Sequence, residues 1–139
     1  MNVYVRQLAT ALGEMGMKID IFTREHLDVV NQVETIGPNV RVIHLKAGEP
    51  DAQLEDLYAL LPDFLEQLND FREEEGLKYD VVHSHYWLSA WAGRELSQAI
   101  NVPHVVNPVI KALVPSIGSS TQTYSASSFS SPNSSPLMP

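Results

Sequence analysis

Short runs of β-branched and apolar residues alternate with segments of helical periodicity along most of this chain. The β-rich runs lie at 17–23, 40–45, 79–84 and 102–106. Apolar residues three and four positions apart, the spacing of a helix face, occupy 2–15, 51–76 and 88–99. The order of helix, strand, strand, helix, strand, helix and strand is typical of an α/β domain with a mainly parallel sheet.

Three local signals refine these boundaries. Asn2 is a favoured capping residue and Gly16 suits a helix end, so we expect the first helix between them. The segment 24–38 ends in Gly-Pro and is expected to be a loop. Pro62 falls inside the helical segment 51–76, where an interior proline costs about 3 kcal/mol. We therefore expect either a kink or two helices with Pro62 near the start of the second.

Composition narrows the classes of function. The 139 residues contain no cysteine, which excludes disulfides, thiolate metal sites and cysteine nucleophiles. The net charge of −8 and the lack of a basic cluster with interleaved aromatic residues argue against a nucleic-acid partner. No apolar run approaches the roughly 18 residues of a membrane span, and the first residues lack the order of a secretory signal. A cytoplasmic protein without a transmembrane segment is expected, and the oligomeric state is open.

Acidic residues concentrate in one segment. Ten of them, against the single basic residue Arg72, lie between Glu49 and Glu75. They could form an acidic docking face, but the solvated side of an amphipathic helix is the favoured interpretation. The part of any site that binds phosphate must therefore come from elsewhere in the chain.

The composition changes after Lys111. From 112 to 139 there is no acidic, basic or histidine side chain, and ten of the twenty-four residues at 116–139 are serine. Such a segment buries too little surface to offset the entropy cost of ordering it. The sequence therefore predicts one folded domain at 1–111 and a disordered Ser/Pro-rich tail at 112–139.

The densest polar and aromatic cluster is His-Ser-His-Tyr-Trp at 83–87, where a β-rich run meets a helical segment. Parallel α/β sheets bind ligands at the carboxyl ends of their strands, so this junction is the expected site. His83 and His85 are two residues apart and point to the same face of a strand. We interpret them as ligand-binding groups with Trp87 packing below. A metal-binding pair and purely structural histidines are the alternatives.

Three segments resemble the acceptor domain of family 4 retaining glycosyltransferases. That family includes sucrose-phosphate synthases and the transferase that attaches N-acetylglucosamine to inositol phosphate. The segments are Asp-Val-Val-His-Ser-His-Tyr-Trp-Leu-Ser at 80–89 with Ala-Gly at 92–93, Met-Asn-Val-Tyr-Val-Arg-Gln-Leu-Ala at 1–9, and Asp-Ile-Phe-Thr-Arg at 20–24. The resemblance runs from Met1 to about Val106 with these segments in the family's order and spacing.

The resemblance implies an incomplete N-terminal domain of a GT-B glycosyltransferase, a fold in which two Rossmann-like halves face each other. The N-terminal half binds the acceptor, which is a sugar, sugar phosphate or inositol phosphate, and the other half binds a nucleotide-sugar donor. Asn2, His85 and Tyr86 would lie at the acceptor pocket, where a helix N-terminus favours an anionic ligand. The resemblance assigns no catalytic residue to this chain, and neither a metal nor a cofactor besides the donor is expected.

The chain departs from the family pattern at both ends. The family's first strand and Gly-Gly loop precede the segment that opens this chain, so a strand in the middle of the sheet would be missing. After 102–106 the family continues with a Thr-x-His element, whereas this chain has Asn-Pro-Val at 107–109. We therefore expect a truncated transferase fragment that is inactive alone. The alternatives are a non-catalytic module that binds sugar phosphates and a small metal-dependent hydrolase that uses His83 and His85.

Overall fold

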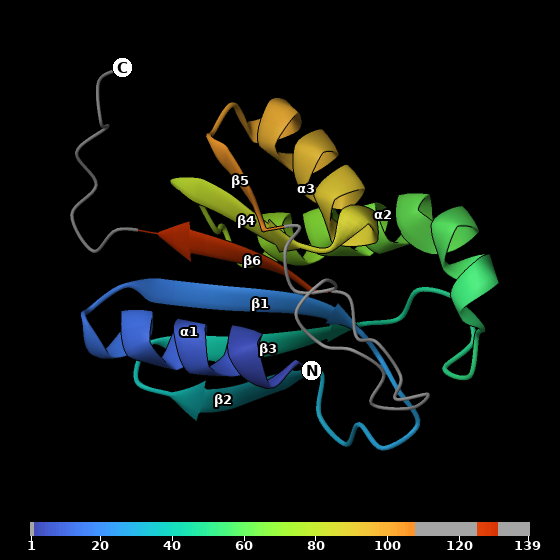
Figure 1. Cartoon of the computed structure of the whole chain (residues 1–139), viewed down its shortest axis with the longest axis horizontal. Coiled ribbons are helices and arrows are strands. Elements are labelled where there is room, and N and C mark those ends of the chain that lie inside the picture. The colour runs from blue at the N-terminus through green and yellow to red at the C-terminus, as the bar shows by residue number, and fades with distance from the viewer. Residues whose placement is uncertain (1, 108–124, 131–139) are drawn as a thin grey trace.

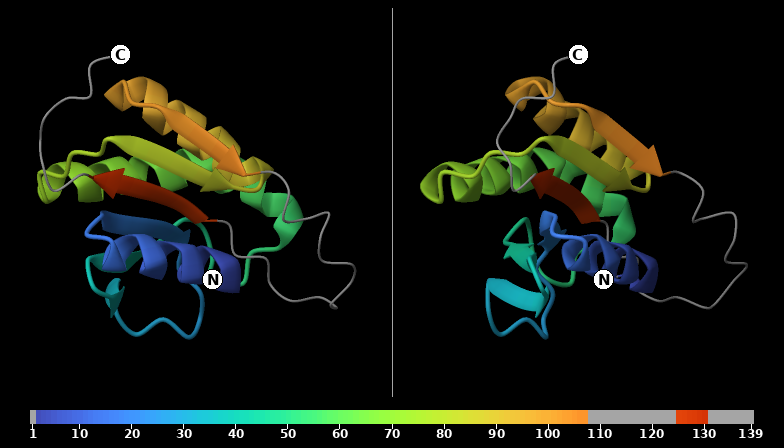
Figure 2. Two further views of the ribbon diagram at one scale, coloured as in Figure 1. Left: turned by 60° about the vertical axis from the view of Figure 1, so that its left-hand side comes forward. Right: turned by 90° about the vertical axis from the view of Figure 1, so that its left-hand side faces the viewer.

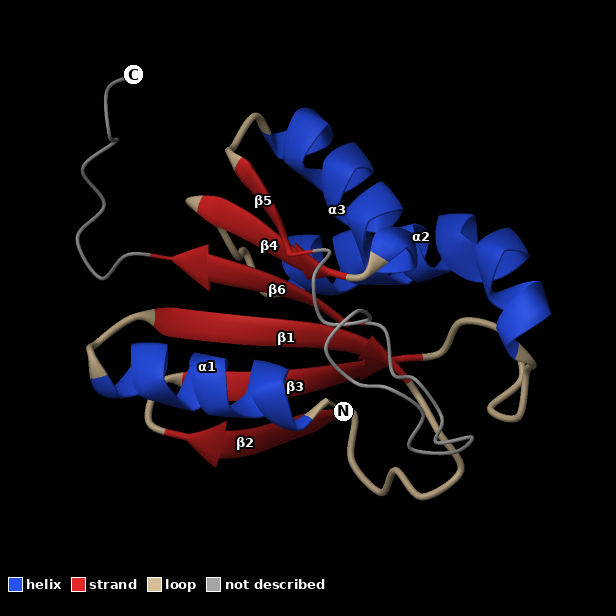
Figure 3. Cartoon of the chain, viewed as in Figure 1, coloured by secondary structure: helices blue, strands red, loops and turns tan. Residues whose placement is uncertain are grey.

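The computed structural model describes residues 2–107 and 125–130 (Figure 1). Its helices are α1 (Val3–Glu14), α2 (Leu57–Glu74) and α3 (Trp87–Ile100), and a single 3₁₀ turn at Leu54–Asp56 precedes α2. Its strands are β1 (Lys18–Arg24), β2 (Val33–Gly37), β3 (Val40–Leu45), β4 (Val81–His85), β5 (His104–Asn107) and β6 (Ser125–Ser130). Figure 3 shows the helices and strands in separate colours. The predicted α/β class is confirmed.

Four of the six strands that the structure describes run in the same direction. The strand order is β2-β3-β1-β6-β4-β5, with β1 parallel to β3 and β4 parallel to β5. Strand β6 is antiparallel to both β1 and β4, and β2 is antiparallel to β3. Helix α1 lies on one face of the sheet, whereas α2 and α3 lie on the other (Figures 1 and 2). Four strands therefore share the predicted parallel direction, while three of the five pairings among the described strands, those of β2 and β6, are antiparallel.

Each face of the sheet has its own apolar core. On one face, Val5 of α1 packs with Ile21 of β1. On the other face, α2 and α3 pack against Phe22 of β1 and Val82 of β4. Adjacent residues of a strand point to opposite faces, which is why β1 contributes to both cores. Strand β1 is buried over most of its length and holds the two layers together.

Helix α2 continues through Pro62 without a break. The two-helix alternative is therefore wrong, since Leu57–Glu74 is one α-helix with Pro62 inside it. Pro62 is exposed, and its ring removes one backbone donor on the solvent side of the helix. Phe64 and Leu68 are buried while Glu66 and Asp70 are exposed, which is the amphipathic arrangement favoured for this acidic segment.

The segment 24–38 differs from the loop expectation, because Val33–Gly37 forms β2. This strand pairs antiparallel with β3 as a hairpin. The Gly-Pro pair at 37–38 lies at the hairpin turn, and Asn39 adopts the positive φ of 60° that a tight turn favours. Strand β2 is at the edge of the sheet and none of its side chains is fully buried, so no clear apolar alternation marks it in the sequence.

Strand β6 occupies the centre of the sheet, between β1 and β4. It comes from the segment predicted to be disordered, so the structure differs from that prediction at Ser125–Ser130. Pairing with two otherwise open strand edges satisfies the backbone donors and acceptors of all three strands, which outweighs the weak strand preference of serine. The other residues of 112–139 lie outside the described residues, and the domain boundary at 111 stays a prediction. The gap that the resemblance implied at the centre of the sheet is thus filled by β6.

Candidate functional site

The carboxyl ends of β1, β3, β4 and β5 meet at one edge of the sheet. The N-terminus of α1 lies at the same edge, because α1 is followed by a tight turn and then by β1, which runs back in the opposite direction. Unpaired backbone N–H groups at a helix start, together with the helix dipole, attract anions. No acidic residue lies in the first turn of α1 to oppose this attraction.

Asn2 does two things at once. Its side-chain oxygen accepts a hydrogen bond from the backbone N–H of Tyr4 at 2.8 Å, which caps α1. Its side-chain nitrogen donates to the hydroxyl of Tyr86 at 3.4 Å, across 84 residues of sequence. The capping and site interpretations of Asn2 are therefore compatible, and the contact joins α1 to the end of β4.

His85 is buried at the end of β4, 1% exposed. Burial, with His83 as a second cause, lowers the pKa of His85 to about 4, so the ring is neutral at neutral pH. The ring centroids of His83 and His85 lie 4.3 Å apart, and the rings of Tyr4 and His85 form a T-shaped contact with centroids 6.0 Å apart. Nδ1 of His85 is buried without a hydrogen-bond partner. A neutral imidazole can either donate or accept a hydrogen bond, which suits a hydroxyl-bearing ligand.

Tyr86 has a strained backbone. Its φ of 71° and ψ of 164° fall in a region that is essentially reserved for glycine, and it is nonetheless a buried tyrosine. Such strain costs about 1–3 kcal/mol and concentrates at functional sites. The strained turn between β4 and α3 places the phenol hydroxyl beside Asn2.

Replacing Tyr86 by glycine and by alanine tests this strain. Both variants lose the ring, but only glycine relieves the backbone, so Tyr86→Gly should be more stable than Tyr86→Ala by about 1 kcal/mol. Urea unfolding of the two variants measures the difference. The same pair of substitutions at exposed Glu95 in α3 should give the opposite order, because alanine is favoured in a helix. An alanine variant that is the more stable at both positions would contradict the strain.

Two residues that the sequence analysis did not single out belong to this site. Asn107, at the end of β5, donates to the hydroxyl of Tyr4 at 3.5 Å. Tyr4 in turn contacts His85. The start of α1 therefore lies beside the ends of both β4 and β5. The signal for Asn107 was its position directly after a β-rich run, at the edge where ligands bind. Tyr4 carried no such signal, because a first-turn tyrosine reads as an ordinary helix residue.

Trp87 does not pack below the site, and that expectation is wrong. It is 57% exposed and stacks on Tyr58 of α2 with centroids 6.1 Å apart. Helix α3 begins at Trp87, and its buried stripe starts one residue later with Leu88. The periodicity of the helix therefore turns the tryptophan outward.

The metal-pair alternative gains no third ligand in the described part of the chain. Within residues 2–107 and 125–130, no group of three or more His, Cys, Asp or Glu side chains gathers at a common point. His104 instead lies within 2.8 Å of the hydroxyl of Ser84, on the face of β4 opposite His83 and His85. Over the same residues, no helix has the length and apolar character that a membrane crossing needs.

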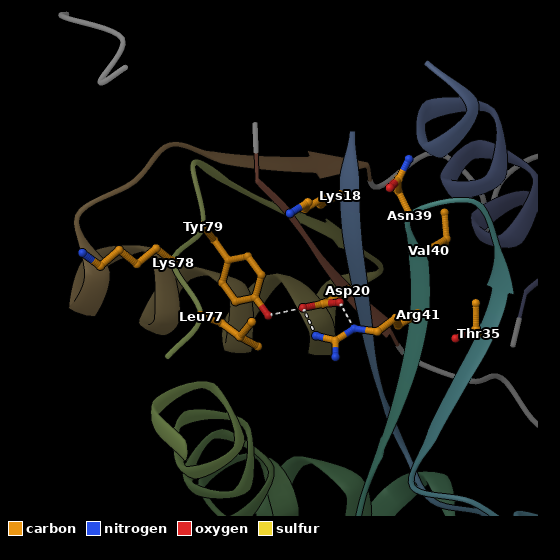
Figure 4. A pocket seen from close by; sticks show the side chains of 9 residues that line it. All are labelled: Lys18, Asp20, Thr35, Asn39, Val40, Arg41, Leu77, Lys78 and Tyr79. Carbon is orange, nitrogen blue, oxygen red and sulfur yellow. Dashed lines mark hydrogen bonds and ion pairs between the residues drawn. The ribbon is translucent and has the colours of Figure 1, made fainter. Parts of the chain in front are cut away.

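A cavity lies near the amino ends of β1 and β3, away from the carboxyl edge (Figure 4). This cavity of about 340 Å³ contains Asp20, which accepts hydrogen bonds from Arg41 at 2.8 and 2.9 Å and from the hydroxyl of Tyr79 at 2.7 Å. Burial and the nearby Asp20 carboxylate raise the pKa of Tyr79, so this hydroxyl stays protonated and donates. The network ties β1 and β3 to the segment before β4. Its polar atoms are engaged with one another, in contrast to the unpartnered imidazole nitrogen at the other edge.

Comparisons with known proteins agree with this fold. The model of the glycosyl transferase 4-like domain matches residues 1–134. A D-inositol 3-phosphate glycosyltransferase from Pseudarthrobacter chlorophenolicus is 43% identical over 108 residues, covering 76% of this chain and 26% of the relative. One from Corynebacterium urealyticum is 38% identical over 115 residues, covering 78% and 27%. Among solved structures, sucrose-phosphate synthase from Thermosynechococcus elongatus has a TM-score of 0.68 at 34% identity, covering 83% of this chain and 30% of that chain.

The sheet, with four strands in one direction and helices on both faces, defines a Rossmann-like α/β domain. The chain belongs to the glycosyl transferase 4-like domain family. Its fold is that of the N-terminal domain of a GT-B glycosyltransferase, as in sucrose-phosphate synthase, so the predicted resemblance to family 4 is confirmed. The chain spans about a quarter of the length of the curated relatives it matches, 26% of the first.

Proposed function

We propose that this chain is the acceptor-binding part of a retaining glycosyltransferase and that it binds a phosphorylated polyol or sugar at the start of α1. The observation that carries the proposal is the contact between the side chains of Asn2 and Tyr86, which joins the helix N-terminus to the end of β4. Around it lie neutral His85 and the amide of Asn107. An anionic group suits the helix start, and uncharged donors and acceptors suit ring hydroxyls.

The residues described here supply the acceptor side only, so we propose that the chain alone does not transfer sugar. The donor is a nucleotide sugar bound by a second Rossmann-like half, and transfer keeps the anomeric configuration. The purified chain, incubated with inositol 3-phosphate and either UDP-glucose or UDP-N-acetylglucosamine, should release no UDP. Release of UDP at a rate that depends on inositol 3-phosphate would contradict the proposed inactivity.

Calorimetric titration with inositol 3-phosphate tests binding. Tyr86→Phe removes one hydroxyl and should weaken binding about three- to tenfold. Asn2→Asp keeps a good helix cap but places a negative charge where the phosphate should bind, so it should weaken binding about tenfold or more. Tyr58→Phe is the matched control, since Tyr58 is an exposed tyrosine of α2 that makes ring contacts with Trp87 and Trp91. Binding unaffected by both site variants, or absent in the wild type, would overturn the proposal.

The non-catalytic binding module remains a second candidate, and the same site supports it. The transferase part and the binding module can be distinguished by adding a separately produced donor half. A transferase part should then release UDP in the presence of inositol 3-phosphate, whereas a pure binding module should not. No observation among the described residues favours the hydrolase alternative.

A further inference from the structure

Two almost fully buried side chains at the carboxyl edge each have a polar atom without a hydrogen-bond partner, and Nδ1 of His44, beside Thr23 on β3, is a further such atom. Thr23, near the end of β1, and His85, at the end of β4, are each 1% exposed. Oγ1 of Thr23 and Nδ1 of His85 make no hydrogen bond. An unsatisfied buried polar atom costs about 1–3 kcal/mol, so each such atom in a folded protein needs an explanation.

The strand register places these two side chains at the same level of the sheet. Ala126 of β6 pairs with Phe22 on one side and with Ser84 on the other. Thr23 and His85 each come one residue later on parallel strands, so they lie level with each other across β6. Neighbouring strands are about 4.8 Å apart, which puts their backbones about 10 Å apart.

Both side chains also point to the face that α1 covers. Thr23 alternates with Ile21, which packs against Val5 near the start of α1. His85 contacts the ring of Tyr4 in the first turn of the same helix. Thr23 and His85 therefore lie on the face of the sheet that α1 covers, one on each side of β6.

We propose that Thr23 is a ligand-binding residue whose hydroxyl bonds a ring hydroxyl of the acceptor, opposite His85. This assignment rests on the proposed function and adds a residue to its site. A hydroxyl group both donates and accepts, and so does a neutral imidazole, so the pair matches the hydroxyls of a polyol ring. The phosphate of the same ligand goes to the helix N-terminus, and Thr23 selects the ring rather than the phosphate.

A purely structural role does not explain this threonine. Valine has the same shape and an equally good strand preference, and at a buried site without a partner it would avoid the cost of the hydroxyl. Thr23→Val should therefore unfold at the same temperature as the wild type or higher. Thr23→Ser keeps the hydroxyl and loses one methyl group, so it should be less stable than the wild type.

The test is calorimetric titration of the full 139-residue chain with inositol 3-phosphate, myo-inositol and inorganic phosphate. Thr23→Val should weaken binding of inositol 3-phosphate about three- to tenfold, and Thr23→Ser should bind like the wild type. Any affinity for inorganic phosphate should be the same in all three proteins. Any affinity for myo-inositol should fall in Thr23→Val only.

The outcomes separate this inference from the proposed function. If the wild type does not bind inositol 3-phosphate, the proposed function fails. If the wild type binds and Thr23→Val binds equally well, the role of Thr23 is wrong and the proposed function stands. A Thr23→Val variant that is less stable than the wild type and loses affinity for inorganic phosphate as well would also overturn the role, because it would show a structural defect.

Discussion

Acidification from about pH 7 to about pH 4 should remove roughly 3 kcal/mol of unfolding free energy through His85. Burial, helped by His83, lowers the pKa of His85 from 6.5 to about 4 in the folded chain. At pH values between about 4 and 6.5, the His85 imidazole is protonated in the unfolded chain but neutral in the folded chain. Lowering the pH through this range therefore favours unfolding. The contribution is complete above pH 6.5 and is lost as the pH falls towards about 4.

Urea unfolding of the wild type and of His85→Asn, measured at several pH values, isolates this contribution. The variant has no imidazole at this position, so it should lose about 3 kcal/mol less than the wild type over the same range. His83→Asn is the control. This variant keeps His85 buried, and burial is the larger cause of its lowered pKa. Its unfolding free energy should therefore keep most of its pH dependence. Parallel pH profiles for the wild type and His85→Asn would show that the ring titrates normally and is not buried as described.

Gly93→Ala should destabilise the fold by about 3 kcal/mol. Gly93 lies in the buried stripe of α3. A methyl group added there would collide with Oγ of Ser84 and would lie 2.6 Å from Nε2 of His104. Those two side chains are themselves hydrogen-bonded at 2.8 Å, so neither can move freely, and α3 would have to shift away from β4. Thermal or urea unfolding measures the loss.

Two further variants make this result specific. Gly37→Ala adds the same methyl group where the nearest atom, Cγ2 of Thr10, is 3.7 Å away, so it should change stability by less than about 1 kcal/mol. Adding Ser84→Ala to Gly93→Ala removes the nearest colliding atom and should recover part of the loss. If Gly93→Ala and Gly37→Ala had equal effects, α3 would not lie as close to β4 as described.

Helix and strand periodicity predicted most of this fold. The elements with a buried face, such as β1 and α3, appear close to their expected residues, because burial on one side imposes the spacing of apolar residues. Strand β2 was missed because an edge strand needs little apolar surface. Strand β6 was missed because it pairs with strands that are distant in the sequence, and no local pattern in its serine-rich segment indicates that pairing.

The candidate site was predictable in part. Asn2, His85 and Tyr86 were named from the sequence, and the structure places them together at the start of α1, with Asn2 bonded to Tyr86. Their role as acceptor-binding residues stays a prediction. The backbone strain at Tyr86 and the unpartnered hydroxyl of Thr23 depend on three-dimensional packing. A sequence pattern cannot show them.

A crystal structure of the chain with inositol 3-phosphate tests the central claim most directly. The account predicts that the phosphate lies against the first backbone N–H groups of α1, with the polyol ring contacting Tyr86 and His85. A ligand bound instead between Lys18 and Lys78, in the cavity at the amino ends of the strands, would contradict it.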